Sequence, residues 1–127
     1  MDCDIWVPAA RPDAIREDNV DELRARLVVS GANISATDGA EKRMHERGVL
    51  NVPDFIANAG GVICAAMEYH GASQAAAFEA IEEKIRHNTE QVLEQSRRRD
   101  VLPRRAAIDL ARRRVEAAMQ TRRWSSF

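Results

Sequence analysis

The stretch Leu27-Val28-Val29-Ser30-Gly31-Ala32-Asn33 places a short run of aliphatic residues directly before a loop of small residues that ends in asparagine. Short apolar runs that contain β-branched residues and stop at glycine are typical of strands buried on both faces of a parallel sheet. Similar runs precede and follow it, at residues 3–7 and 49–52. The sequence therefore predicts three strands.

Amphipathic segments separate these strands. Residues 17–25 carry apolar residues three apart in a polar surround, which predicts a short helix. Residues 37–47 predict a second helix, which Thr37 can cap and Gly48 can end. Strands that alternate with helices over short connections are joined in parallel by right-handed crossovers. The predicted fold class is α/β, with a partial Rossmann-like parallel sheet of three strands in the order βαβαβ.

Helices alone are predicted after this sheet. We expect an apolar helix at 62–69, a long amphipathic helix at 73–99 and a last helix that begins at Pro103. The long helix should pack through Phe78, Ile81, Ile85, Val92 and Leu93, and the last helix through Ala107, Ile108, Ala111, Val115, Ala118 and Met119. These C-terminal helices are expected to pack on the sheet or on a further neighbour.

Size and composition favour one folded domain. The chain has 127 residues, of which 45% are hydrophobic and 31% charged, so a long disordered tail is not expected. A net charge of −1 gives no overall attraction to nucleic acid or to an anionic membrane surface. No apolar run approaches the roughly 20 residues of a membrane-spanning helix. Since no secretory signal is visible, we expect a cytoplasmic protein in which Cys3 and Cys64 are reduced, buried thiols.

Three loops are expected to line a ligand site. In a parallel sheet the carboxyl ends of the strands share one edge, where ligands of open α/β sheets bind. The loops that follow the three strands are residues 8–10, 31–33 and 57–61, and all contain small residues. Asn33 and Asn58 are the polar candidates, because a side-chain amide both donates and accepts hydrogen bonds without carrying charge.

Glycine precedes the helix predicted at residue 62. Gly60 and Gly61 would leave backbone N–H groups free at the positive end of that helix, where a carboxylate or phosphate can bind. The alternative, which the spacing leaves open, is that Asn33 and Asn58 are ordinary turn residues and the two glycines form a tight bend.

Other reactive residue types favour structural roles. The three histidines, His45, His70 and His87, have no partner at metal-ligand spacing, so surface positions are expected and no metal site is predicted. Cys64 could be a nucleophile near a helix start, although packing against the sheet is the favoured interpretation. Arginine runs at 97–99, 112–114 and 122–123 suggest nucleic-acid binding as an alternative. Nearby glutamates, helix ends and the lack of interleaved aromatic residues disfavour it.

Three strings carry a more specific signal. They are Cys3-Asp4-Ile5-Trp6-Val7-Pro8-Ala9-Ala10, Gly31-Ala32-Asn33 and Val52-Pro53-Asp54-Phe55-Ile56-Ala57-Asn58-Ala59-Gly60-Gly61-Val62. In their composition, order and intervals they resemble the glutamate/leucine/phenylalanine/valine dehydrogenase family. The resemblance covers most of the chain, including the long helices.

This resemblance implies an oxidoreductase that converts an L-amino acid to a 2-oxo acid and ammonia, with NAD or NADP as the hydride acceptor. It makes residues 1–71 the second half of a dinucleotide-binding domain and residues 72–127 the helices that pack on it. It also implies that Ala9, Ala10 and Asn33 lie beside the nicotinamide and its ribose. Asn58 would lie near both nicotinamide and substrate.

The same resemblance implies a substrate-binding role for Val62 and Ala65. Ala65 matches the position at which glutamate enzymes of the family usually place a serine that binds the distal carboxylate. Alanine cannot donate that hydrogen bond, so the substrate expectation shifts from glutamate toward an apolar amino acid. Glutamate stays open, and so does the choice between NAD and NADP.

Two family elements do not occur in these 127 residues: the domain with a catalytic lysine and aspartate, and the Gly-x-Gly-x-x-Gly loop. Lys42 and Lys84 are expected on the outer faces of helices, so no catalytic residue is assigned. We therefore expect a fragment that is inactive alone and that binds a companion chain or forms a homo-oligomer. The alternative is a non-catalytic remnant or partner subunit.

Overall fold

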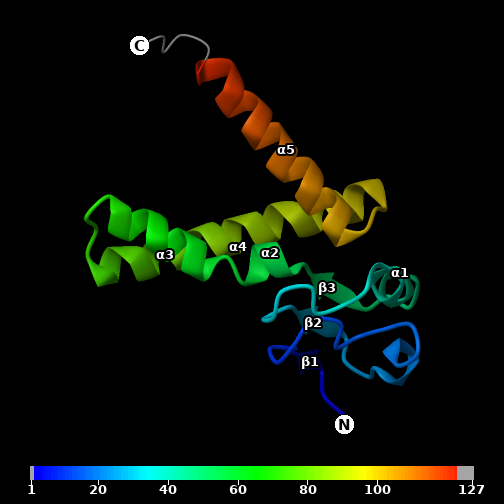
Figure 1. The fold of residues 1–127 in the computed structure, drawn as a ribbon. Coiled ribbons are helices and arrows are strands. Elements are labelled where there is room, and N and C mark those ends of the chain that lie inside the picture. The colour runs from blue at the N-terminus through cyan, green and yellow to red at the C-terminus, as the bar shows by residue number, and fades with distance from the viewer. Residues whose placement is uncertain (1, 123–127) are drawn as a thin grey trace.

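Three parallel strands form the sheet of the computed structural model, which describes residues 2–122, with side chains to residue 120. They are β1 (Ile5–Trp6), β2 (Leu27–Val29) and β3 (Leu50–Val52), in the spatial order β1-β2-β3 (Figure 1). Trp6 lies beside Val28, and Val28 lies beside Asn51. The predicted three-stranded parallel α/β fold is confirmed.

Alternation along the strands divides the core into two parts. Val28 points to a cluster that contains the buried residues Ile15, Val20, Ala36, Ala40 and Met44, with Trp6 packed against it. The residues on either side of it, Leu27 and Val29, point to the second cluster, because successive strand side chains face opposite ways. That cluster is formed by Val52, Ile56, Val92, Ala106, Ala107 and Leu110. Core residues therefore cover both faces of β2, while Ile5 of β1 is 58% exposed.

The first cluster is closed by two short elements, η1 (Val20–Glu22) and α1 (Asp38–Glu46). The hydroxyl oxygen of Thr37 accepts a hydrogen bond from the Ala40 N–H at 3.3 Å, and Gly48 has φ +73° after the helix. The cap and the stop predicted for α1 are both confirmed.

The helix predicted at 17–25 was wrong, since only the single 3₁₀ turn of η1 forms there. The side chain of Asn19 accepts from the Arg16 N–H and donates to the Ala14 carbonyl, so it fixes a turn before η1. At the other end, the Arg47 guanidinium donates to the carbonyls of Val20 and Leu23. These side-chain bonds replace the backbone bonds of a longer helix.

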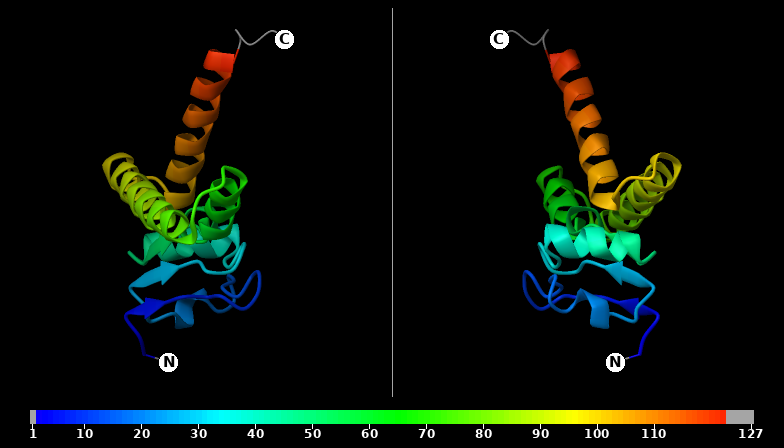
Figure 2. Two further views of the ribbon diagram at one scale, coloured as in Figure 1. Left: turned by 90° about the vertical axis from the view of Figure 1, so that its left-hand side faces the viewer. Right: turned by 90° about the vertical axis from the view of Figure 1, so that its right-hand side faces the viewer.

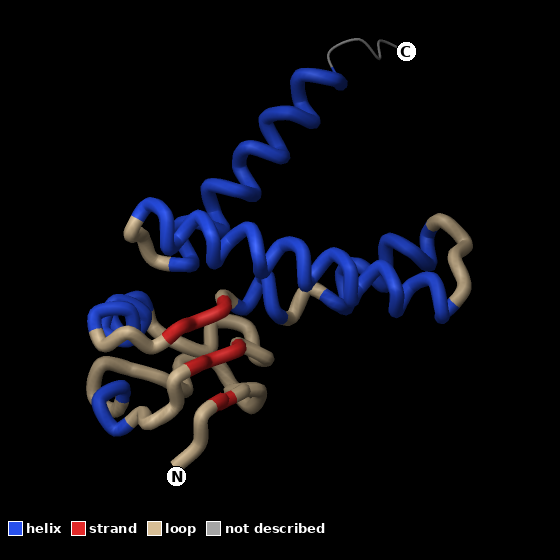
Figure 3. The backbone as a smooth tube through the Cα atoms, turned by 180° about the vertical axis from the view of Figure 1, so that it is seen from behind, coloured by secondary structure: helices blue, strands red, loops and turns tan. Residues whose placement is uncertain are grey.

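Four helices follow β3: α2 (Asp54–Ala57), α3 (Gly60–Tyr69), α4 (Gln74–Arg99) and α5 (Pro103–Arg122). α2 was not predicted, and α3 begins two residues before its predicted start, so Gly60 and Gly61 form its first turn. α4 and α5 begin close to their expected positions, with Ser73 capping α4 through a bond from the Ala76 N–H. Figure 3 shows these helices as one group beside the strands.

The expected packing of the long helices was partly wrong. Val92 and Ala107 are buried as predicted, but Phe78, Val115 and Met119 are 62%, 59% and 63% exposed. The buried residues of α5 lie in its first two turns, and Arg114 further along still donates to Asn88 and Gln91 of α4. Figure 2 shows the later part of α5 extending away from the sheet. Cys3 and Cys64 are free thiols but half-buried, and Cys64 lies beside α4 rather than against the sheet.

Candidate functional site

Hydrogen bonds join the three loops at the carboxyl ends of the strands. The carbonyl oxygen of Pro8 accepts from the N–H groups of Gly31 and Ala32 at 3.1 and 2.9 Å. The Asn58 Nδ2 donates to the Asn33 Oδ1 at 2.7 Å and to the Gly31 carbonyl at 3.4 Å. The prediction that these strand ends meet at one edge is therefore confirmed.

Gly31 allows the first two loops to approach closely. A Cβ added to Gly31 would lie 3.1 Å from the Cβ of Ala9 and 3.3 Å from a methyl carbon of Val7. Contacts that close are tighter than ordinary van der Waals packing, so these loops leave little room for a side chain at Gly31. Ala9 and Ala10 are both exposed beside this contact and present a flat surface of small side chains.

The bond between Asn33 and Asn58 leaves one group of each amide unused. Within residues 2–122, the Asn33 Nδ2 and the Asn58 Oδ1 make no hydrogen bond. One is a donor and the other an acceptor, and together they complement a ligand carboxamide, which has an N–H₂ and a C=O group. Asn33 is exposed and Asn58 half-buried, so a ligand can reach both.

The start of α3 borders the same loops. Its N-cap residue, Ala59, makes no side-chain hydrogen bond to the first turn. A Cβ on Gly61 would meet nothing within 4 Å, so the backbone is open to approach there. The first N–H groups of a helix point along its axis at the positive end of its dipole. This end of α3 is open to approach, and the binding of an anionic group there stays a prediction.

Val62 and Ala65 lie one turn apart on the exposed side of α3. Val62 is 77% exposed, and Ala65 is exposed beside it. Tyr69 lies seven residues after Val62, near the same face, and is 88% exposed. The helix thus presents an apolar surface next to the asparagine pair.

Sequence reasoning missed the carboxylate behind the pair. Asp54 is 6% exposed at the start of α2, and its Oδ2 accepts from the Ile34 N–H at 2.8 Å. Its Oδ1 accepts from Arg104 at 2.9 Å. Burial acts to raise the pKa of Asp54, but the bonds from Ile34 and Arg104 outweigh it and hold that pKa below its ordinary value. The only signal in the sequence was the position of Asp54 directly after Pro53.

The comparisons with known proteins identify a family. Residues 1–123 match the family model described as glutamate/leucine/phenylalanine/valine dehydrogenase. The chain belongs to this family.

The relatives of this dehydrogenase-family chain include enzymes that use either nicotinamide cofactor. It is 42% identical to the NADP(+)-dependent glutamate dehydrogenase of Pyrobaculum calidifontis, over 98% of this chain and 31% of that enzyme. It is 37% identical to the NAD-specific glutamate dehydrogenase of Staphylococcus aureus, over 98% of this chain and 32% of that one. The chain therefore spans about a third of the length of these relatives.

A solved structure shows the same fold. The chain superposes on the hetero-hexameric glutamate dehydrogenase of Thermus thermophilus, in a leucine-bound form, with a TM-score of 0.80 and 25% identity. The match covers 96% of this chain and 31% of the other. The partial sheet is thus of the Rossmann type found in these dehydrogenases.

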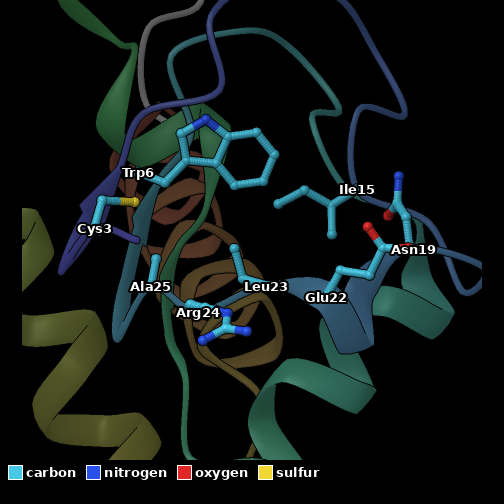
Figure 4. Close-up of a pocket in the computed structure, with 8 residues that line it drawn as sticks. All are labelled: Cys3, Trp6, Ile15, Asn19, Glu22, Leu23, Arg24 and Ala25. Carbon is cyan, nitrogen blue, oxygen red and sulfur yellow. The ribbon is translucent and has the colours of Figure 1, made fainter. Parts of the chain in front are cut away.

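One surface pocket of this family member lies elsewhere. A cavity of about 360 Å³ is lined by residues that precede β1 and β2, among them Cys3 and Ala25, together with Trp6, Ile15 and Leu23 (Figure 4). It lies toward the amino ends of the strands, away from the asparagine pair. The candidate site is by contrast an open surface.

The other residues considered as candidates in the sequence lie outside this site. Within the described residues no group of three or more His, Cys, Asp or Glu side chains could hold a metal ion. His45 lies 3.8 Å from the exposed Asp100, and the thiol of Cys64 lies 3.9 Å from Glu68. Lys42 and Lys84 are exposed on helices, as predicted. None of the helices in residues 2–122 is long and apolar enough to cross a membrane.

Proposed function

We propose that this chain forms the nicotinamide and substrate side of an amino-acid dehydrogenase site. The observation that carries the proposal is the asparagine pair at the joined strand ends of a family member. When bound, NAD or NADP would supply the acceptor for the hydride of the amino acid. Asn33 and Asn58 would hold the carboxamide of the nicotinamide through their unused donor and acceptor.

The surrounding residues fit that cofactor. Ala9 and Ala10 are small and exposed beside the close contact at Gly31, so a flat ring can lie against the backbone. An amide pair orients such a ring without introducing charge, and charge would alter its electronic properties. Asn58 thereby lies between the cofactor and the face of α3.

The substrate proposed for this site is an L-amino acid with an apolar side chain. Val62 and Ala65 present hydrocarbon to the site, and neither can donate a hydrogen bond to a distal carboxylate. The family name includes leucine, phenylalanine and valine enzymes beside glutamate ones, so both substrate classes occur among relatives. Glutamate is the competing substrate in the test described below.

The remaining parts of the site are proposed to come from polypeptide outside these 127 residues, whether continuous with them or on a companion chain. The chain spans 31% of the Pyrobaculum calidifontis enzyme, and the Thermus thermophilus relative is hetero-hexameric. In this proposal residues 1–71 are the second half of the dinucleotide-binding domain, residues 72–127 pack on it, and the chain is inactive alone. The match to catalytic relatives favours this assignment over a non-catalytic partner subunit.

Cofactor binding tests the proposal directly. The isolated chain, labelled with ¹⁵N, is titrated with NADH while the side-chain amide signals of Asn33 and Asn58 are followed by NMR. We expect both signals to shift, and Asn33→Ala or Asn58→Ala to weaken binding by about 5- to 30-fold, the loss of one or two hydrogen bonds. Asn88→Ala is the matched control, because Asn88 lies on α4 and bonds Arg114 instead.

One result of the NADH titration would contradict the proposal. If NADH shifts signals elsewhere on the chain but leaves both asparagine amides unchanged, the nicotinamide side of the site is not here.

A further inference from the structure

Behind the asparagine pair lies a buried ion-pair cluster that draws together three helices. Arg104, near the start of α5, donates from Nε and Nη2 to the two carboxylate oxygens of Glu41 on α1, both at 2.8 Å. The same Nη2 donates to Asp54 on α2 at 2.9 Å. The side chains of Glu41 and Asp54 are 5% and 8% exposed, and that of Arg104 is 23% exposed.

Glu41 and Arg104 each make one further contact. Glu41 Oε1 also accepts from Asn51 Nδ2 at 3.2 Å, and the guanidinium carbon of Arg104 lies 5.6 Å from the centre of the Phe55 ring. A planar guanidinium can bond one carboxylate through two nitrogens and a second carboxylate at the same time, in a fixed geometry that the single nitrogen of a lysine ammonium cannot reproduce. The position of Asp54 is thus tied to α1 and α5 through Arg104.

Asp54 in turn holds both asparagine-bearing segments. Its Oδ2 accepts from the N–H of Ile34, the residue directly after Asn33, and its backbone carbonyl accepts from the N–H of Asn58 at 2.7 Å. Ile34 has φ +52°, a left-handed conformation that a β-branched residue rarely adopts. Such a conformation persists only where surrounding bonds enforce it, and the carboxylate of Asp54 supplies one of them.

We propose that Arg104 is a positioning residue that, through Asp54, sets the geometry of Asn33 relative to Asn58. It touches neither asparagine. The ligand of the pair rests on the function proposed above, but the positioning itself does not, because it can be measured without cofactor.

The contrast between Arg104 and its neighbour makes the test specific. Arg104→Lys keeps the charge but loses the planar group that bonds two carboxylates at once. Arg105→Lys changes an adjacent exposed arginine whose ion pair, in the part of the chain that the structure describes, is with Asp109 on the same helix. Val92→Ala adds a control for stability, since Val92 is fully buried in the core cluster that packs against the first turns of α5 and takes part in none of these ion pairs. Asp54→Asn breaks the same link from its other end.

The readout is the pair of asparagine side-chain amide signals in the NMR spectrum of the free protein. We expect Arg104→Lys and Asp54→Asn to shift both signals, and to weaken NADH binding by roughly 2- to 30-fold, the range found for residues that act through others. Arg105→Lys and Val92→Ala should leave the signals in place, whatever the loss of stability in Val92→Ala.

Two results would overturn the inference. One is an unchanged pair of amide signals in a folded Arg104→Lys or Asp54→Asn protein. The other is an equal change in Val92→Ala, which would show a general effect of lost stability. If the wild-type chain does not bind NADH, the proposed function fails, while the amide signals still decide the positioning role.

Discussion

At the scale of single residues, the strand ends in the sequence predicted part of the candidate site. Asn33 and Asn58 could be predicted because both follow strands of one parallel sheet, and such loops share an edge. Their direct contact and the closeness of Gly31 to Ala9 followed from no sequence pattern. Asp54 and Arg104 escaped notice because they are 50 positions apart, and only the folded chain brings them within bonding distance.

A residue-scale prediction concerns Ala65. Ala65→Ser adds the hydroxyl that a glutamate side chain would need, on the exposed face of α3. A hydrogen bond to a carboxylate contributes about 1.5–3 kcal/mol, so we expect the ratio of kcat/KM for glutamate to that for leucine to rise at least ~10-fold. The measurement uses the assembled enzyme with both amino acids.

Ala66→Ser is the matched control for this change. Ala66 is also exposed on α3 but points about 100° away from Ala65 around the helix. An equal rise in both variants, or a fall in the glutamate ratio for Ala65→Ser, would contradict the assignment of Ala65 to the substrate pocket.

At the scale of elements, the helices with clear caps were predictable and the others were not. Thr37 and Gly48 marked α1 correctly, because their cap and stop geometry is local. α2 has only four residues, which is too short to show a helical repeat. The 3₁₀ turn η1 depends on Arg47, which lies more than 20 residues further along the chain.

Asp54 joins α2 to α5 through its ion pair with Arg104, and this link predicts that stability depends on pH. Its pKa in the folded chain lies below the ordinary value of 3.8, with burial opposed by Ile34 and Arg104. The stability that results from this depressed pKa is fully present at pH values above the pKa of Asp54 in the unfolded chain. It is lost as the pH falls through the pKa of Asp54 in the folded chain. Arg104 from α5 and Glu41 from α1 are the charged groups that face it.

We therefore expect the free energy of unfolding, measured in urea from pH 7 to pH 2.5, to fall below about pH 4 in part through Asp54. Asp54→Asn should cost about 2 kcal/mol near pH 7, where a charged hydrogen bond is lost, and less at pH 3. A difference between the two proteins that stays constant over this range would show that the Asp54 carboxylate is not the titrating group.

At the scale of the whole molecule, periodicity predicted which helix faces are apolar but not what covers them. Val92 and Val115 occupy comparable apolar stripes of α4 and α5, yet one is fully buried and the other 59% exposed. The reason is geometric, because the later part of α5 extends away from the sheet (Figure 2). A hydrophobic stripe carries no information about the direction in which its helix leaves the core.

Activity at this scale is predicted to require more than these 127 residues. We expect the isolated chain to oxidise no amino acid above background with NAD or NADP. Mixing it with a polypeptide that carries the part of the Pyrobaculum calidifontis enzyme outside the matched 31% should produce cofactor-dependent deamination, measured as NADH or NADPH formation at 340 nm.

The Asn58→Ala chain is the control for this mixture. It keeps the sheet and helices but removes the amide that lies between the loops and α3, so any activity that depends on this chain should fall at least ~5-fold. Turnover by the wild-type chain alone would contradict the incomplete site. Turnover in the mixture that is unaffected by Asn58→Ala would instead show that the partner polypeptide carries the whole site. If this chain contributes its asparagine pair to the site, the rate must depend on that pair.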